Sequence, residues 1–199
     1  MKTTTAVDAI VIGGSTGALE ALAVLLPAIP RHCAIPVAVV VHLPPTKPSH
    51  LAEVLAMRTS LPVQEVEDKQ PVVGGVIYVA PPNYHLLIER GGNFALSADE
   101  QIHFSRPAID ILFDSASDSY RERLAGIILT GANADGARGL ATIKRRGGLA
   151  IVQSPIGAIA RNMPDAAIAA SRTAHVLSLE EIASWLKDLA GGGPLKESQ

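Results

Sequence analysis

Short apolar runs alternate with longer amphipathic stretches along most of the chain. Most of the runs are rich in Val, Ile, Leu and Ala and have no polar face, as in strands that are buried on both sides. The stretches between them repeat apolar residues at a helical spacing. The pattern predicts strands at 9–13, 36–42, 61–68, 75–82, 125–131, 149–153 and 175–179.

Helices are predicted between these strands, at 15–30, 49–59, 106–124, 134–148, 163–172 and 180–190. The first should stop near Pro27, Ser49 should cap the second, and Pro107 should lie in the first turn of the third. Residues 85–97 differ from the rest. Two short apolar runs there flank the segment Arg90-Gly91-Gly92-Asn93, which indicates an antiparallel hairpin.

Parallel strands that alternate with helices place the chain in the α/β class. We expect a doubly wound three-layer α/β/α sandwich, with a mostly parallel sheet and the hairpin as an antiparallel addition. No stretch has the length or composition of a linker, so residues 1–191 should form one domain. The glycine-rich end, 192–199, is predicted to be a flexible tail.

The composition excludes several classes of protein. The 199 residues are 48% hydrophobic and carry a net charge of -2, so nothing favours binding to nucleic acid or to an anionic membrane surface. Cys33 is the single cysteine, which rules out an internal disulfide and a zinc site made of several thiolates. We expect a buried thiol, no metal and no cofactor. Without a secretory signal or an apolar run of roughly 20 residues, the chain is predicted to be cytoplasmic.

Three reactive side chains directly follow predicted parallel strands. Ser15 comes two residues after the first strand, His42 ends the second, and Asp135 follows the strand at 125–131. In open α/β sheets the carboxyl ends of the strands line the ligand site, so we expect these three side chains to meet. Each residue type also has structural uses at such places, as a helix cap or as a hydrogen-bonded filler at a strand end.

A serine, an imidazole and a carboxylate are the parts of a triad of nucleophile, base and orienting group. The imidazole of His42 would take the proton of Ser15 during attack, and the carboxylate of Asp135 would hold the imidazole in one tautomer. The oxyanion that develops on the substrate needs hydrogen-bond donors. Backbone N–H groups at the start of the first helix suit that purpose, so Thr16 and Gly17 are the candidates.

A non-catalytic or nucleotide-binding α/β module is the alternative interpretation. The segment GGSTGA falls short of G-x-G-x-x-G, because Ser15 replaces the second glycine, and His42 stands where an acidic residue would hold a ribose. The segment from Gly131 to Gly136 has the glycine spacing of a P-loop but lacks its Lys and its Ser or Thr. A module that had lost its chemistry would fit the same two segments.

Six segments, in this order, resemble the catalytic domain of the CheB-type protein-glutamate methylesterases of bacterial chemotaxis. They are IGGSTGALEAL, VVHLPP, VAPPNYHLLI, RPAIDILF, ILTGANADGARGL and NMPDAAIAA, within residues 8–171. The resemblance implies a doubly wound α/β domain that hydrolyses glutamate γ-methyl esters on the cytoplasmic helical domain of chemoreceptors and releases methanol. Some members also deamidate receptor glutamines. The serine, histidine and aspartate of the family fall on Ser15, His42 and Asp135.

The chain departs from the family's usual pattern near the expected site. Gly14 and Ala18 flank Ser15-Thr16-Gly17, where the family usually has Ala and Gly. Ala132 and Asn133 stand where the family usually has Met and Gly, and that methionine lines the site. These changes leave the triad intact, widen one wall and add a polar group, so they bear on substrate range.

Many members of the family also carry an N-terminal receiver domain whose phosphorylation relieves inhibition. Only a few residues precede the first strand, so the chain is either a stand-alone enzyme or a piece of a longer protein, and its first residues favour the former. A stand-alone enzyme would need another regulator, acting in trans, or none.

Five further polar residues lie near these segments. His85 and His103 are expected in surface loops, and Asn162 is expected to shape the loop before a helix. Arg106 and Asp110 open the RPAIDILF helix, where they would either cap it and form an ion pair or position a substrate.

Overall fold

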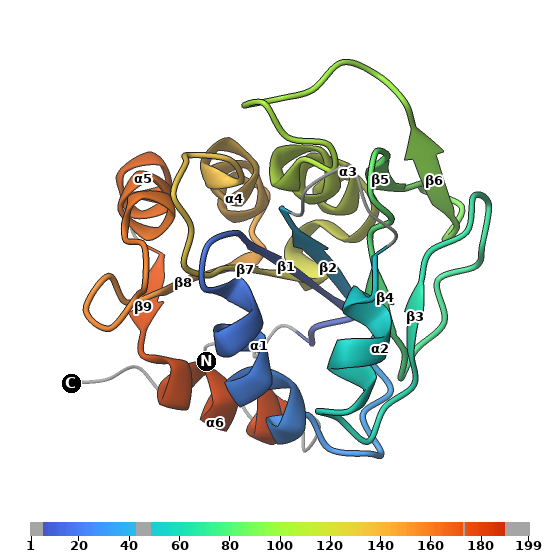
Figure 1. The fold of residues 1–199 in the computed structure, drawn as a ribbon, viewed down its shortest axis with the longest axis horizontal. Coiled ribbons are helices and arrows are strands. Elements are labelled where there is room, and N and C mark those ends of the chain that lie inside the picture. Colours follow the sequence, from blue (N-terminus) through green and yellow to red (C-terminus); the bar gives the residue numbers. More distant parts are fainter. Residues whose placement is uncertain (1–5, 43–48, 173, 190–199) are drawn as a thin grey trace.

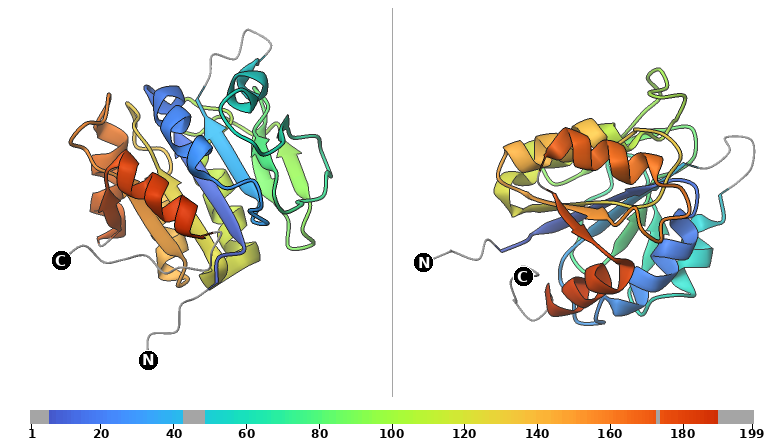
Figure 2. Two further views of the ribbon diagram at one scale, coloured as in Figure 1. Left: turned by 90° about the horizontal axis from the view of Figure 1, so that it is seen from below. Right: turned by 90° about the vertical axis from the view of Figure 1, so that its left-hand side faces the viewer.

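The computed structural model describes residues 6–42, 49–172 and 174–189, which form three layers (Figure 1). Seven parallel strands make the central sheet, in the order β3-β4-β2-β1-β7-β8-β9. Helices cover both faces of this sheet (Figure 2). The predicted doubly wound α/β/α sandwich is therefore confirmed, while the predicted tail lies outside the described residues. The strands are β1 (Ala9–Gly14), β2 (Val37–Val41), β3 (Val63–Glu65), β4 (Ile77–Val79), β7 (Leu124–Ile128), β8 (Leu149–Gln153) and β9 (His175–Leu177).

The predicted hairpin is also present and forms a separate two-stranded sheet. β5 (His85–Ile88) pairs antiparallel with β6 (Phe94–Ser97). Phe94 is fully buried, and the centroid of its ring lies 4.6 Å from that of Tyr78 on β4. This aromatic contact anchors the hairpin to the main sheet.

The helices lie close to their predicted positions, but α1, α2, α3 and α4 each begin two or three residues later than expected. A 3-10 turn that carries Pro27 follows α1, as the proline predicts. α3 begins at Ile109 because Ala108 is still extended, so Pro107 precedes the helix instead of lying in its first turn. None of the described helices is long and apolar enough to cross a membrane. The helices are α1 (Ala18–Leu25), α2 (Leu51–Ala56), α3 (Ile109–Tyr120), α4 (Ala137–Arg145), α5 (Asn162–Ser171) and α6 (Leu179–Leu189).

Apolar side chains fill both interfaces between the sheet and its helices. α1, α2 and α6 cover one face, where Cys33 is buried as predicted. α3, α4, α5 and the hairpin cover the other face. Every residue of β1, β2, β4 and β7 is buried, which explains why these runs are apolar without alternation.

β1 lies where the winding of the sheet reverses. The chain passes from β1 to β2 on one side, and β7 later pairs with the other side of β1. The register sets Gly14 opposite Val41 and Gly13 opposite Ile128. The carboxyl ends of β1, β2 and β7 therefore lie side by side, at the place where open α/β sheets bind ligands.

Gly13 lets α3 approach this edge of the sheet closely. A Cβ atom at Gly13 would lie 2.3 Å from Cγ2 of Ile109, the first residue of α3. Any side chain at this position would push the start of the helix away from β1.

Replacing Gly13 by alanine is therefore expected to destabilise the protein, because Ile109 could not keep its place. The free energy of unfolding should fall by about 1–3 kcal/mol, the usual cost of overpacking a core. Gly91→Ala is the control, because a methyl group there meets only Asn93 Nδ2, at 4.0 Å. Urea unfolding measures both variants, and equal stabilities would contradict the close approach of α3.

Candidate functional site

Ser15 lies in the turn that joins β1 to α1. Its backbone N–H donates to the carbonyl of Thr130 (3.0 Å), and its carbonyl accepts the N–H of Ala18 (2.8 Å). Gly17 ends the turn in the left-handed region, with φ 82°, which residues with a side chain rarely adopt. The turn is thereby fixed at both ends, and Ser15 is half-buried at the edge of the sheet.

Two backbone N–H groups of this turn, those of Thr16 and Gly17, have no acceptor among the described residues. Thr16 is exposed, and both groups precede the amino-terminal end of α1, which carries partial positive charge. The turn thus leaves open the two groups that the sequence predicts as oxyanion donors.

The structure brings His42, which follows β2, to Asp135, which lies in the loop before α4. Nε2 of His42 lies 2.8 Å from Oδ2 of Asp135. The imidazole is 11% exposed and the carboxylate is fully buried. The two residues are 93 positions apart, so the order of the strands creates this contact. Two of the three predicted residues are therefore in direct contact.

The carboxylate of Asp135 also caps α3. Oδ2 accepts the N–H of Ile109 (2.7 Å), and Oδ1 accepts the N–H of Asp110 (3.0 Å). Burial raises the pKa of Asp135, but hydrogen bonds from His42 and from these two N–H groups outweigh burial, so the pKa lies below its usual value. Asp135 is therefore ionised at neutral pH and can only accept. It follows that Nε2 of His42 carries the proton of their hydrogen bond.

Ser15 and His42 are neighbours across the sheet. The register pairs Gly14 with Val41, and the N–H of His42 donates to the carbonyl of Gly14 (3.2 Å). Neighbouring strands are about 4.8 Å apart, so Ser15 and His42 follow directly as the next pair. Among the described residues, no hydrogen bond joins the Ser15 hydroxyl to the imidazole. Such bonds often tighten only when a substrate is bound.

Thr130, just after β7, holds the serine turn in place, which the sequence did not predict. Its hydroxyl lies 2.9 Å from the carbonyl of Thr16 and accepts the N–H of Ala160 (2.8 Å). The side-chain carbonyl of Gln153 accepts the N–H of Thr130 (2.8 Å). Because Thr130 and Gln153 are both buried, this network ties the turn firmly to β8 and to the loop before α5.

The two residues predicted to line the site, Ala132 and Asn133, lie in the loop between β7 and α4. Ala132 is exposed, and its carbonyl accepts Nδ2 of Asn162 (3.2 Å). Asn133 is half-buried, and its Oδ1 accepts the N–H of Asp135 (3.2 Å). Both asparagines therefore shape the loop that presents Asp135, although Asn162 was expected to shape the loop before its own helix and is instead the first residue of α5.

Close packing accounts for the glycines that suggested a nucleotide site. A Cβ atom at Gly17 would lie 2.7 Å from Cβ of Ile159. Gly136 has φ 88°, and a Cβ atom there would lie 2.5 Å from Cδ1 of Ile128. Both positions need glycine for reasons that involve no phosphate.

The expectation of a surface loop is wrong for His85, whereas His103 is exposed as predicted. His85 is 1% exposed, at the start of β5. Its Nδ1 accepts the N–H of Ala108 (3.1 Å), so Nε2 carries the proton and donates to the carbonyl of Glu100 (2.9 Å). The imidazole thus holds the residue just before α3. The sequence offers no local signal for this contact, because the fold alone brings the hairpin to the helix.

Arg106 and Asp110 both have structural partners. Nη1 of Arg106 donates to the carbonyls of Ala98 (2.7 Å) and Asp99 (2.9 Å). Asp110 is 2% exposed and pairs with Arg138 on α4 (3.3 Å). The ion pair predicted between Arg106 and Asp110 is therefore not formed, because the fold brings Arg138 of α4 to Asp110 and turns Arg106 to the carbonyls of another loop.

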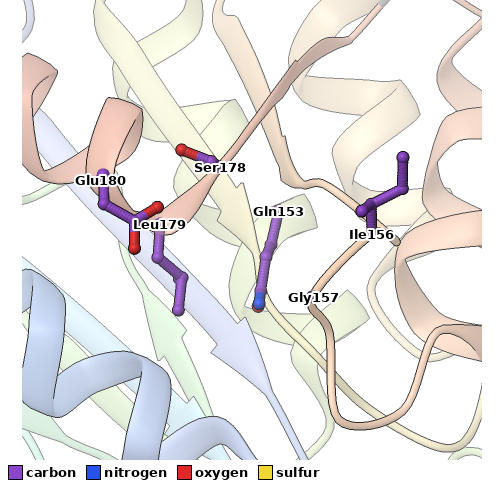
Figure 3. A pocket seen from close by; sticks show the side chains of 6 residues that line it. All are labelled: Gln153, Ile156, Gly157, Ser178, Leu179 and Glu180. Carbon is purple, nitrogen blue, oxygen red and sulfur yellow. The ribbon is translucent and has the colours of Figure 1, made fainter.

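A pocket of about 100 Å³ lies beyond the end of β8 (Figure 3). Figure 3 shows Gln153 between the loop at Gly157 and the start of α6, where Ser178 and Glu180 lie. None of the three predicted triad residues lines this pocket. Within the described ranges, no group of three or more His, Cys, Asp or Glu side chains is arranged to hold a metal ion.

The sequence matches one family of known proteins. Residues 10–186 match the profile of the family described as CheB methylesterase. A Leptospira interrogans protein is 46% identical over 88% of this chain and 91% of its own length. A Symbiobacterium thermophilum protein is 34% identical over 92% of this chain and 51% of its own length. Both proteins have protein-glutamate methylesterase and protein-glutamine glutaminase in their names.

The fold leads to the same family. The crystal structure of the Thermotoga maritima CheB methylesterase catalytic domain matches this chain with a TM-score of 0.87 at 32% identity, over 92% of this chain and 99% of that one. The chain spans nearly all of the Leptospira relative and about half of the Symbiobacterium relative. On the agreement of profile, relatives and fold, this chain belongs to the CheB methylesterase family.

Proposed function

We propose that this chain is a serine hydrolase that removes methyl groups from glutamate γ-methyl esters of chemoreceptors. The observation that carries the proposal is the buried carboxylate of Asp135, bound to Nε2 of His42 beside Ser15 at the end of β1. Membership of the CheB methylesterase family supports the class of reaction, and the names of the relatives support glutamate side chains as the substrate.

In the first step, Ser15 attacks the carbonyl carbon of the ester. Because Nε2 of His42 carries the proton shared with Asp135, the lone pair of Nδ1 accepts the serine proton. The buried carboxylate stabilises the imidazolium that forms. The imidazolium then returns the proton to the departing methoxide. Methanol leaves, and an acyl-enzyme remains on Ser15.

The oxyanion of the tetrahedral intermediate binds the N–H groups of Thr16 and Gly17. The N–H of Ser15 is already donated to the carbonyl of Thr130, whereas these two have no acceptor among the described residues. Donors that are fixed before the reaction lower the barrier without reorganisation, and losing one typically costs about 100- to 1000-fold in turnover. Ala132 and Asn133 line the site from the loop that presents the aspartate.

Water completes the reaction. His42 takes a proton from a water molecule, the oxygen attacks the acyl carbonyl, and Ser15 leaves with the proton, so that a free glutamate remains. The same steps convert glutamine to glutamate when ammonia takes the place of methanol. The names of the relatives include this second activity, so deamidation of receptor glutamines belongs to the proposal.

The proposed substrate is the cytoplasmic helical domain of methyl-accepting chemoreceptors, and the proposed location is the cytoplasm. A glutamyl ester carbonyl is three bonds from the backbone, so the receptor helix must lie against the carboxyl edge of the sheet to reach Ser15. The steps above draw on side chains, backbone N–H groups and water, and they need no cofactor.

Ser15→Ala is expected to abolish ester hydrolysis while the fold survives. Turnover should fall by at least about 1000-fold, as it does when a triad nucleophile is removed. The Ser15 hydroxyl makes no hydrogen bond within the described part of the chain, so the melting temperature should change little. Methanol release from a methylated receptor fragment and labelling by a fluorophosphonate probe measure the activity, and thermal unfolding measures whether the fold survives.

Ser49→Ala is the matched control for that variant. The Ser49 hydroxyl accepts the N–H of Leu51 at the start of α2 (3.2 Å), so its loss should cost about 1 kcal/mol of stability and leave labelling intact. The proposed function would be wrong if the fluorophosphonate probe labelled Ser15→Ala, or if the wild type were neither labelled nor active.

Asp135→Asn is expected to remove stability that depends on pH. The pKa of Asp135 is lower in the folded state than in the unfolded chain, so its carboxylate stabilises the fold above the unfolded pKa of about 3.9. This contribution disappears as the pH falls through the lowered pKa. In the wild type, both carboxylate oxygens of Asp135 accept backbone N–H groups. An asparagine has only one such oxygen, so its NH2 group would face an N–H donor and leave it without an acceptor. The stability difference from wild type should therefore be largest at neutral pH and should narrow below about pH 4.

Urea unfolding across this pH range measures the difference. Asp165→Asn is the control, because Asp165 forms an exposed ion pair with Arg161 that contributes little. If the difference in stability between wild type and Asp135→Asn stays constant or widens in acid, the carboxylate of Asp135 is not what stabilises this edge of the sheet.

A further inference from the structure

Two carboxylates cap each other's helices beside His42. Asp135, in the loop before α4, accepts the N–H groups of Ile109 and Asp110 at the start of α3. In return, Oδ1 of Asp110 accepts the N–H of Gly139 on α4 (2.7 Å). Each carboxylate therefore fixes the helix on which the other depends, and a shift of one displaces the other.

Arg138 supplies the compensating charge. Its Nε lies 3.3 Å from Oδ2 of Asp110, and its Nη2 lies 3.0 Å from Oδ2 of Asp114. Asp110 is 2% exposed and Asp135 is fully buried, whereas 62% of the arginine side chain is exposed. The two buried carboxylates repel each other, and the guanidinium of Arg138 at the surface offsets that repulsion.

The titration of these groups reflects the same surroundings. Burial raises the pKa of Asp110, and the charge of Asp135 adds to that effect, while the bonds from Gly139 and Arg138 oppose it. Partial desolvation lowers the pKa of Arg138, but the charges of Asp114 and Asp110 outweigh it and raise the pKa. The charges of Asp110 and Asp135 therefore interact, and Asp135 is the direct partner of the imidazole.

We propose that Asp110 and Arg138 are positioning residues that set, with opposite signs, how strongly His42 holds its proton. They act through Asp135, whose carboxylate lies between them and the imidazole. The inference rests on the proposed function, in which His42 is the base of the reaction.

The groups that face Asp110 come from each element packed against it. Asp135 comes from the loop before α4, Arg138 from α4, and Asp114 from the next turn of α3. His85 of β5 meets this end of α3 at Ala108, whose N–H its Nδ1 accepts.

The charges predict opposite shifts in the two variants. Asp110→Asn keeps an oxygen for the N–H of Gly139 but removes a negative charge, so the titration midpoint of His42 should fall by about half a pH unit. Arg138→Gln removes a positive charge, so the midpoint should rise, by less because the guanidinium is exposed and screened. The double variant should return close to the wild-type midpoint. Loss of a helix cap alone would produce no such reversal of sign.

The experiment is a proton NMR titration of the histidine rings in the full chain, with the His42 signal identified by its loss in His42→Gln. The pH dependence of kcat/KM for p-nitrophenyl acetate is measured on the same variants, and its acid limb should move with the NMR midpoint. Arg146→Gln is the matched control. Arg146 pairs with Asp118 and joins the same two helices, but Asp118 is eight residues, about 12 Å along α3, from Asp110. Arg146→Gln should therefore leave the titration midpoint of His42 unchanged.

Shifts of the same sign in both variants, or no shift in folded variants, would overturn the inference. If Asp110→Asn does not fold, Arg138→Gln still tests the inference. The side chain of Arg138 is exposed, so this variant should fold, and its His42 midpoint must rise. The proposed function is tested separately by Ser15→Ala. Hydrolysis that does not need Ser15, together with opposite shifts at His42, would remove the proposed function and leave this charge coupling standing.

Discussion

The carboxylate of Asp135 is fully buried, and the rest of the site is arranged around its hydrogen bonds. It accepts the N–H groups of Ile109 and Asp110 and binds the imidazole of His42. A buried charge without such partners would cost several kcal/mol, so each partner must be in place for the fold to be stable. β2 supplies the imidazole, α3 supplies the N–H groups, and the loop before α4 supplies the carboxylate. The site therefore forms only when the sheet and this helix layer have packed together.

That packing depends on how closely α3 approaches the sheet. A side chain at Gly13 or at Gly136 would collide with Ile109, whose N–H is one of the groups that Asp135 holds. The glycines therefore bring the start of the helix within reach of the carboxylate. Thr130, which follows β7, and the buried Gln153 on β8 hold the serine turn by a separate network of hydrogen bonds. The nucleophile and the base are thus supported by different elements, which meet at the end of β1.

The sequence could predict the fold and the candidate site to the extent that each depends on local pattern. Buried strands are apolar throughout, and reactive residues after such strands converge wherever parallel strands end together. This reasoning selected Ser15, His42 and Asp135, and the structure joins the last two directly. It placed Pro107 inside α3 and His85 in a surface loop, and both predictions were wrong. In each case a partner from another element, which no local pattern indicates, decided the outcome.

The sequence by itself determined the order of strands and helices, the α/β class and the positions of the reactive residues. Only the tertiary structure decided what surrounds them: which N–H groups Asp135 accepts, how His85 holds the residue before α3, and how Thr130 reaches the serine turn. These contacts join residues 23 to 114 positions apart. They depend on the packing distance between layers and on the strand order, which is a property of the whole core and not of any one segment.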